Sequence, residues 1–167
     1  TQTTGLRECY ALAETASGTL LAAGTGFGGS PVRSFDGTSW TTFGTTPLAF
    51  TIGSMVHQAN GSVVVASRLY ETPSQVLSTG SASGPWTSLG TADHEIVGLA
   101  TRSNGALFAA GKFQSIGGVP TQHVAQWNGS WSGLASAGQD GSVLCAAATP
   151  TGFVVGGSFA AIDGMPA

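Results

Sequence analysis

Charged residues are scarce in this sequence of 167 residues, which contains five Lys or Arg and eight Asp or Glu. The charged fraction is 8%, whereas soluble domains contain roughly 25%. The net charge is −3, so the sequence gives no sign of the basic patch that binds nucleic acids or anionic membranes. We therefore expect no nucleic-acid partner.

Long apolar runs and clustered cysteines are also missing. No segment reaches the roughly 18 uninterrupted apolar residues of a membrane-spanning helix, so we expect no membrane insertion. Cys9 and Cys145 lie far apart, with no second thiol or histidine at ligand spacing, so we expect neither a metal nor a cofactor. Whether they pair is open at this point: they would meet only if the first and last parts of the chain became neighbours. Buried free thiols are the default expectation.

Small and hydroxylated residues take the place of charge. The chain contains 26 Gly, 20 Thr and 19 Ser. A composition poor in Lys and Glu and rich in Ser, Thr and Gly is common in secreted β-rich proteins. The composition therefore favours an extracellular or cell-surface location.

The sequence repeats with a period of about 45 residues. Turns that combine a small residue with glycine recur with spacings of 43, 44 and 47, and tryptophans recur with spacings of 46 and 45. These two markers share one register, which indicates a repeat architecture. The markers are Gly18, Gly61, Gly105 and Gly152, and Trp40, Trp86 and Trp131.

Each repeat predicts four short antiparallel strands. Apolar runs of four to six residues precede and follow each glycine turn, which is the length of strands and too short for helices. A second turn, such as Asp36-Gly37 or Asn128-Gly129, then leads into a strand opened by tryptophan. No segment shows a capped helical pattern. The sequence therefore predicts an all-β fold, and four strands per repeat at this period is the pattern of β-propeller blades.

The third repeat carries a specific resemblance. Its segments Ile116-Gly117-Gly118-Val119-Pro120 and Trp127-Asn128-Gly129-Ser130-Trp131 resemble the kelch-like propeller repeats of large secreted bacterial proteins and fungal cortical-marker proteins. The fourth repeat contains the related segment Ile162-Asp163-Gly164-Met165-Pro166, whereas the first two repeats match loosely. The resemblance implies propeller blades and by itself no activity, because this fold hosts many functions.

About three and a half repeats fill a single β-propeller region, residues 1–167. They cover residues 8–51, 52–95, 96–142 and, in part, 143–167, and residues 1–7 are expected to be the tail of a preceding strand. Because propellers need about four to eight blades to close, three explanations are open. The chain is an arc of a longer protein, which we favour, or a four-bladed ring with a short last blade, or half of a dimer.

Few residues suggest chemistry. Asp93, His94 and Glu95 form the densest group of titratable residues, in a loop where a metal or a general base is conceivable, although a polar solvated loop is the simpler interpretation. Tyr70 and Glu71 stand where the repeat calls for Gly-x-Phe, so they are candidate ligand contacts. Trp127 is a candidate for stacking on a sugar, although packing between blades is the simpler role for the repeated tryptophans. We expect no catalytic residue.

These observations favour a non-enzymatic structural or interaction module of a secreted or surface-exposed protein. It would bind a protein partner through its loops or pack into an assembly such as a fibre. One alternative is a carbohydrate-binding propeller, as in lectins or receptor-binding adhesins. The other is the non-catalytic part of a secreted glycan-processing hydrolase or oxidase.

Overall fold

The computed structural model of the chain describes residues 6–26, 32–44, 51–68, 73–134, 142–159, 161–162 and 165–166. All regular secondary structure in these residues is β-strand, and the paired strands are antiparallel. The predicted all-β fold is therefore confirmed. A helix of the length and hydropathy needed to cross a membrane is not found in this part of the chain.

The first sheet is a four-stranded meander. It contains β1 (Leu6–Glu14), β2 (Leu20–Gly26), β3 (Val32–Phe35) and β4 (Trp40–Thr42), in that order. β1 begins at Leu6, which is the register partner of Gly26. Leu6 and Arg7 therefore belong to this sheet, and assigning all of residues 1–7 to a preceding strand was wrong.

The second sheet repeats this meander and gains two short strands at its edge. It is built from β5 (Ile52–His57), β6 (Val63–Ser67), β7 (Ser74–Thr79) and β8 (Thr87–Ala92). A hairpin of β11 (Ser115–Ile116) and β12 (Val119–Pro120) extends it, giving the order β12-β11-β8-β7-β6-β5. This hairpin is the Ile-Gly-Gly-x-Pro segment, so a motif of the third repeat pairs with the sheet of the second.

The third sheet and a terminal hairpin complete the described structure. The sheet has the order β14-β13-β10-β9 and contains β9 (Ile96–Thr101), β10 (Leu107–Gly111), β13 (Val124–Trp127) and β14 (Trp131–Gly133). The terminal hairpin pairs β15 (Ser142–Ala148) with β16 (Phe153–Ser158). A second short hairpin follows, β17 (Ala161–Ile162) with β18 (Met165–Pro166).

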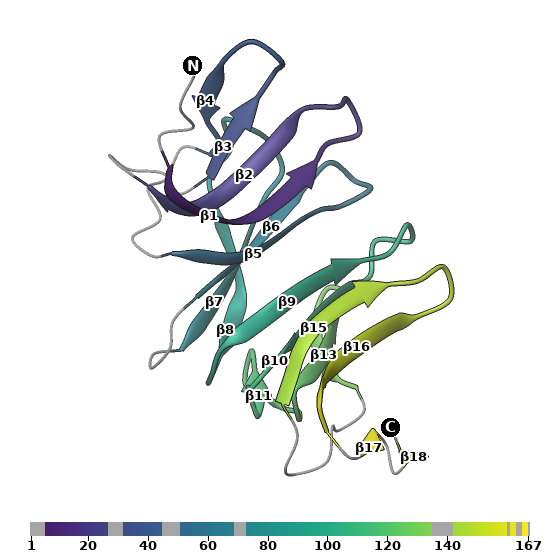
Figure 1. Ribbon diagram of the computed structural model, residues 1–167. Helices are drawn as coiled ribbons and strands as arrows, with labels where there is room; N and C mark the ends of the chain where they lie inside the picture. The colour runs from purple at the N-terminus through teal and green to yellow at the C-terminus, as the bar shows by residue number, and fades with distance from the viewer. Residues whose placement is uncertain are drawn as a thin grey trace.

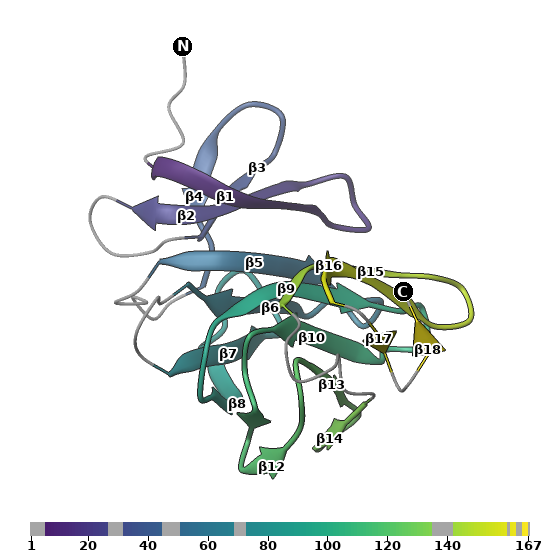
Figure 2. The ribbon, with the colours of Figure 1, turned by 60° about the horizontal axis from the view of Figure 1, so that its bottom comes forward.

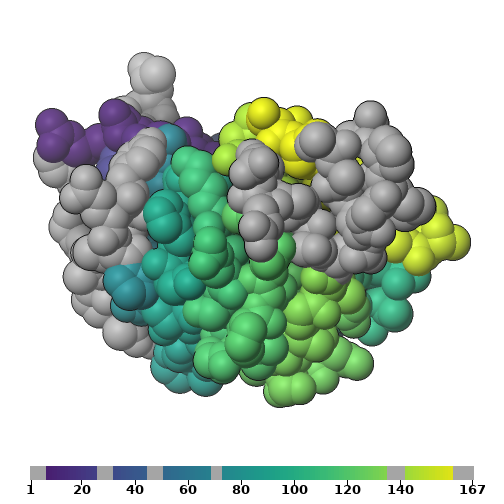
Figure 3. Space-filling view, turned by 90° about the horizontal axis from the view of Figure 1, so that it is seen from below, coloured from purple at the N-terminus to yellow at the C-terminus, as the bar shows by residue number. Residues whose placement is uncertain are grey.

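The sheets are stacked face to face along the chain (Figures 1 and 2). Their first strands β1, β5, β9 and β15, here called the inner strands, contact one another in that order. In the space-filling view, the second and third sheets form one continuous surface in teal and green (Figure 3). The three larger sheets have four to six strands and the two terminal hairpins have two each, and the described strands do not close into a barrel or a ring.

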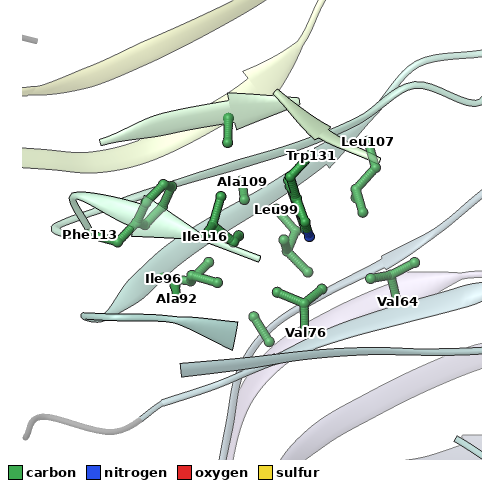
Figure 4. Close-up of a cluster of buried hydrophobic side chains, with 12 residues drawn as sticks. Val64, Val76, Ala92, Ile96, Leu99, Leu107, Ala109, Phe113, Ile116 and Trp131 are labelled. Atoms are coloured by element: carbon green, nitrogen blue, oxygen red, sulfur yellow. The ribbon is translucent and has the colours of Figure 1, made fainter. Parts of the chain in front are cut away.

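Apolar side chains between the sheets form the core. One buried cluster joins the first and second sheets, and a larger one, shown in Figure 4, joins the second and third. In Figure 4, Phe113 and Ile116 of the third repeat lie close to Ala92 of the second sheet. Two smaller clusters join the third sheet to the terminal hairpin, including the stacked rings of Phe108 and Phe153. Each sheet therefore buries its apolar residues against its neighbours in the stack, as repeat architectures require.

Three of the four predicted glycine turns have the same geometry. Gly18, Gly61 and Gly105 have φ between 83° and 87°, a region that glycine enters without steric cost. The same pair of backbone hydrogen bonds closes each of these turns, for example Arg102 N–H to Ala106 O and Gly105 N–H to Arg102 O, both 2.9 Å. The fourth hairpin is one residue shorter, because Ala148 pairs with Phe153, and Gly152 is not among the glycines with positive φ.

The two cysteines are free and exposed, which corrects the expectation that they are buried. Cys9 lies on β1 and Cys145 on β15, the inner strands at the two ends of the stack. Their exposure follows from this placement, because in the described structure no sheet covers the outer face of the first sheet or of the terminal hairpin.

Candidate functional site

Every inner strand carries a β-bulge at the same place. The register shifts between Cys9 and Ala11 in β1, and corresponding shifts occur in β5, β9 and β15. A bulge adds one residue to a strand and redirects its side chain. The added residues are Tyr10, Gly53, Val97 and Leu144, each eight positions before its repeat's turn glycine.

The four bulge residues line one common cavity of about 280 Å³. Arg68, Glu95 and Ile96 complete its lining. The guanidinium carbon of Arg68 lies 4.7 Å from the centre of the Tyr10 ring, in a cation–π arrangement. The cavity therefore combines one aromatic ring, aliphatic side chains and charges of both signs. Sequence reasoning missed this cavity, because the four positions share a fixed offset from the turn glycines but no residue type.

Glu95 is buried at the edge of this cavity and is paired with Lys112. The Lys112 Nζ lies 3.1 Å from Glu95 Oε2, and the Lys112 backbone N–H donates to Glu95 O at 2.9 Å. Gly111 packs against the same carbonyl so closely that a Cβ would lie 2.1 Å from Glu95 O. The pairing ties the start of β9 to the end of β10.

Asp93 holds the loop that leads into the β11–β12 hairpin. Its Oδ1 accepts hydrogen bonds from Gln114 N–H at 2.9 Å and from Ser115 N–H at 3.1 Å. Burial acts to raise the pKa of Asp93, but the N–H donors of Ser115 and Gln114 outweigh it, so the pKa lies below its usual value. Asp93 therefore fixes a segment of the third repeat to the second sheet.

The predicted group Asp93-His94-Glu95 does not converge on one point. His94 is exposed, and its Nδ1 accepts a hydrogen bond from Glu95 N–H at 2.9 Å, while the two carboxylates engage different partners. Within the described ranges, no group of three His, Cys, Asp or Glu side chains is placed to hold a metal ion. The geometry assigns Asp93 and Glu95 to contacts between chain segments.

The repeated tryptophans occupy packed positions. Trp131 is buried between the second and third sheets, and Trp86 packs against the cluster between the first and second. Trp40 is half-buried and stacks on Phe35 with the ring centres 4.9 Å apart. Trp127, the candidate for sugar stacking, is half-buried beside Trp131 at 5.3 Å between ring centres.

Tyr70 and Glu71 lie outside the described residues. His123, in contrast, is placed in a second cavity of about 520 Å³ that Gln114, Pro120, Thr121 and Gln122 also line. It is the one non-glycine residue with positive φ in the described structure, at 66°, and its N–H donates to Phe113 O at 2.9 Å. Its sequence neighbourhood contains no signal for this conformation, because the contact with Phe113 forms only when the loop folds back.

Comparisons with known proteins do not assign the chain to a family. No protein-family model matches the chain, and no curated protein matches it.

Proposed function

We propose that the chain is an arc of kelch-like β-propeller blades and acts as a non-enzymatic structural and interaction scaffold of a secreted or surface-exposed protein. The observation that carries this proposal is the recurrence of one inner-strand geometry, with the same bulge in four consecutive repeats. A bulge bends its strand and increases the local twist, and a bulge kept at one place in each repeat is consistent with the radially repeated four-stranded sheets of a propeller.

Specific contacts between consecutive repeats support a rigid stack. Gln58 Nε2 donates to Gly105 O at 3.2 Å, and one repeat later Arg102 donates to Pro150 O at 2.7 Å. Gln58 and Arg102 occupy the same position of their glycine turns, at the start of each turn. The hydrogen bond from Leu99 N–H to Ser54 Oγ, 2.9 Å, links two inner strands. Polar side chains thus hold neighbouring repeats in a fixed relation.

The charged residues near the inner strands also hold separate segments of the chain together. Asp93 binds the backbone that leads into the β11–β12 hairpin, and Glu95 binds Lys112. A carboxylate engaged by two backbone donors or by an ammonium group orders the chain segments that it joins. This use of the scarce charges favours a scaffold over a reaction centre.

Hydrogen exchange of the intact chain tests the scaffold. A rigid stack predicts that the amides of β5, β6, β9 and β10, which lie inside the stack, exchange slowest and through one shared opening reaction. Separate opening of the second and third sheets, with different exchange free energies, would contradict the proposal. In the same preparation we expect no turnover of glycoside, ester or peptide substrates, and turnover of any of them would contradict the non-enzymatic function.

A carbohydrate-binding function has one observation in its favour. Trp127 is half-buried and precedes the exposed residues Asn128, Gly129 and Ser130, so part of its ring is near the surface. Sugar rings stack on such aromatic faces. Titration with glycans, read by tryptophan fluorescence, distinguishes the two functions: quenching that Trp127→Ala abolishes supports a lectin, and no quenching by any glycan supports the scaffold.

A further inference from the structure

The outer face of the first sheet carries apolar residues at positions that are buried in the second and third repeats. Leu12 is 62% exposed, whereas Met55 and Leu99, which occupy the same position in the second and third repeats, are 5% and 6% exposed. Met55 packs against the first sheet and Leu99 against the second, so this position contacts the preceding sheet of the stack.

Cys9 shows the same difference in exposure between the first repeat and the later repeats. It is exposed, whereas the equivalent residues of the three later repeats are fully buried against the preceding sheet. Each of these residues directly precedes the bulge residue of its inner strand. The equivalent residues are Ile52, Ile96 and Val143.

The terminal hairpin exposes the positions that, in earlier repeats, contact the following sheet of the stack. Val154 is 56% exposed, whereas Val64 and Phe108, at the corresponding place in the second and third repeats, are 0% and 3% exposed. Val64 packs toward the third sheet and Phe108 toward the terminal hairpin, so this position contacts the following sheet. Cys145 takes the position next after the bulge in β15 and is exposed on the same hairpin.

The contacts inside the stack show how two such faces fit together. Ser54, at the position of Cys145, accepts the hydrogen bond from Leu99 N–H, and Leu99 is at the position of Leu12. One repeat later, Gly98 packs against Ala146, with 3.3 Å between its ideal Cβ position and Ala146 N. A small residue on one inner strand therefore lies against the backbone of the next. By the same rule, Cys145 fits against the backbone at Leu12.

We propose that a second copy of this chain places its first sheet on the terminal hairpin, head to tail, and so continues the stack. The partner is a second copy because the two free faces carry the two complementary residue patterns that already pair at the internal junctions. The contact is heterologous, so it closes a ring of two arcs or extends into a filament. It rests on the scaffold function proposed above and specifies how the scaffold assembles.

Crosslinking through the two cysteines tests this arrangement, because head-to-tail contact brings Cys9 of one copy near Cys145 of the other. A short bis-maleimide is added to the 167-residue chain and to the single-cysteine variants Cys9→Ser and Cys145→Ser. We expect crosslinked species of at least twice 16.6 kDa from the unmodified chain. Neither variant alone is crosslinked, but an equal mixture of the two is. Crosslinking of either variant alone, or of none of the samples, overturns the proposal.

A substitution on the free face provides the independent test. Leu12→Glu places a charge in the proposed contact, so the fraction of associated chain in sedimentation equilibrium falls at least tenfold. Ser132→Glu, an exposed change on the outer strand β14, is the matched control and leaves association unchanged. Loss of association by the control, or a chain that is monomeric without any substitution, overturns head-to-tail assembly. A monomer with uniformly slow hydrogen exchange in its inner sheets still supports the scaffold function, so the two proposals fail separately.

Discussion

Trp131 of the third sheet donates its indole Nε1–H to the backbone carbonyl oxygen of Leu89 in the second sheet, at 2.6 Å. The ring itself lies in the cluster between the two sheets and covers Gly90 and Gly117, where a Cβ would lie 2.9 Å and 2.5 Å from indole atoms. One repeat earlier, Trp86 lies against Gly44, two residues after the last strand of the first sheet. Trp86 and Trp131 therefore each join two consecutive sheets.

Replacing this tryptophan by phenylalanine tests its hydrogen bond. Trp131→Phe leaves the Leu89 carbonyl without its donor and lowers the free energy of unfolding by about 2 kcal/mol. Trp86→Phe is the matched control, because the Trp86 Nε1 is buried without an acceptor among the described residues. We expect the control to lose less than half as much in urea unfolding. Equal losses would show that the hydrogen bond contributes nothing.

Gly111 is the site of the second prediction. A Cβ there would lie 2.1 Å from Glu95 O and 2.9 Å from Ile96 Cα, both backbone atoms that move only with the strand. Gly111→Ala should therefore lower the free energy of unfolding by about 2 kcal/mol. Gly80→Ala, with no atom within 4 Å of its Cβ position, should change it by less than about 0.5 kcal/mol. Thermal melts of both variants against the parent chain measure the difference, and similar losses would contradict the close packing.

The sequence predicted the repeat but not the contacts between repeats. Turn glycines such as Gly61 are local features, since a tight hairpin demands positive φ at one position whatever surrounds it. The pairing of Ile116 with Ala92 in the neighbouring sheet joins segments of different repeats, and no local pattern specifies it. The cavity at the bulges depends on four strands at once, so it emerged only with the stacked inner strands.

The candidate chemical residues illustrate the same limit. Asp93 and Glu95 were recognised as an unusual cluster, but their partners Gln114, Ser115 and Lys112 lie about 20 residues further along the chain. Sequence reasoning identified the residue types and not their partners, because a carboxylate looks the same whether it binds a metal, a substrate or a backbone amide.

Acidification should weaken the attachment of the β11–β12 hairpin. The folded-state pKa of Asp93 lies below its ordinary value of 3.8, so its stabilising contribution is complete above that value and disappears as the pH falls through the folded-state pKa. In Asp93→Asn the side chain is neutral at every pH. The variant should be less stable than the parent chain at pH 7, and the difference should be smaller at pH 3. Urea unfolding at both pH values measures this, and a constant difference would contradict the role of the charge.

The last prediction concerns the buried member of the ion pair. Lys112→Met leaves the Glu95 carboxylate buried without its ammonium partner, and such a group is costly to keep charged. Because Lys112 is partly exposed, solvent screens the pair, and we expect a loss of about 1–2 kcal/mol in the free energy of unfolding. Glu95→Gln in the same background removes the unpaired charge, so the double variant should recover part of the loss. A double variant as unstable as the sum of both single changes would show that the two side chains act independently, and the ion pair would then have no part in joining β9 to β10.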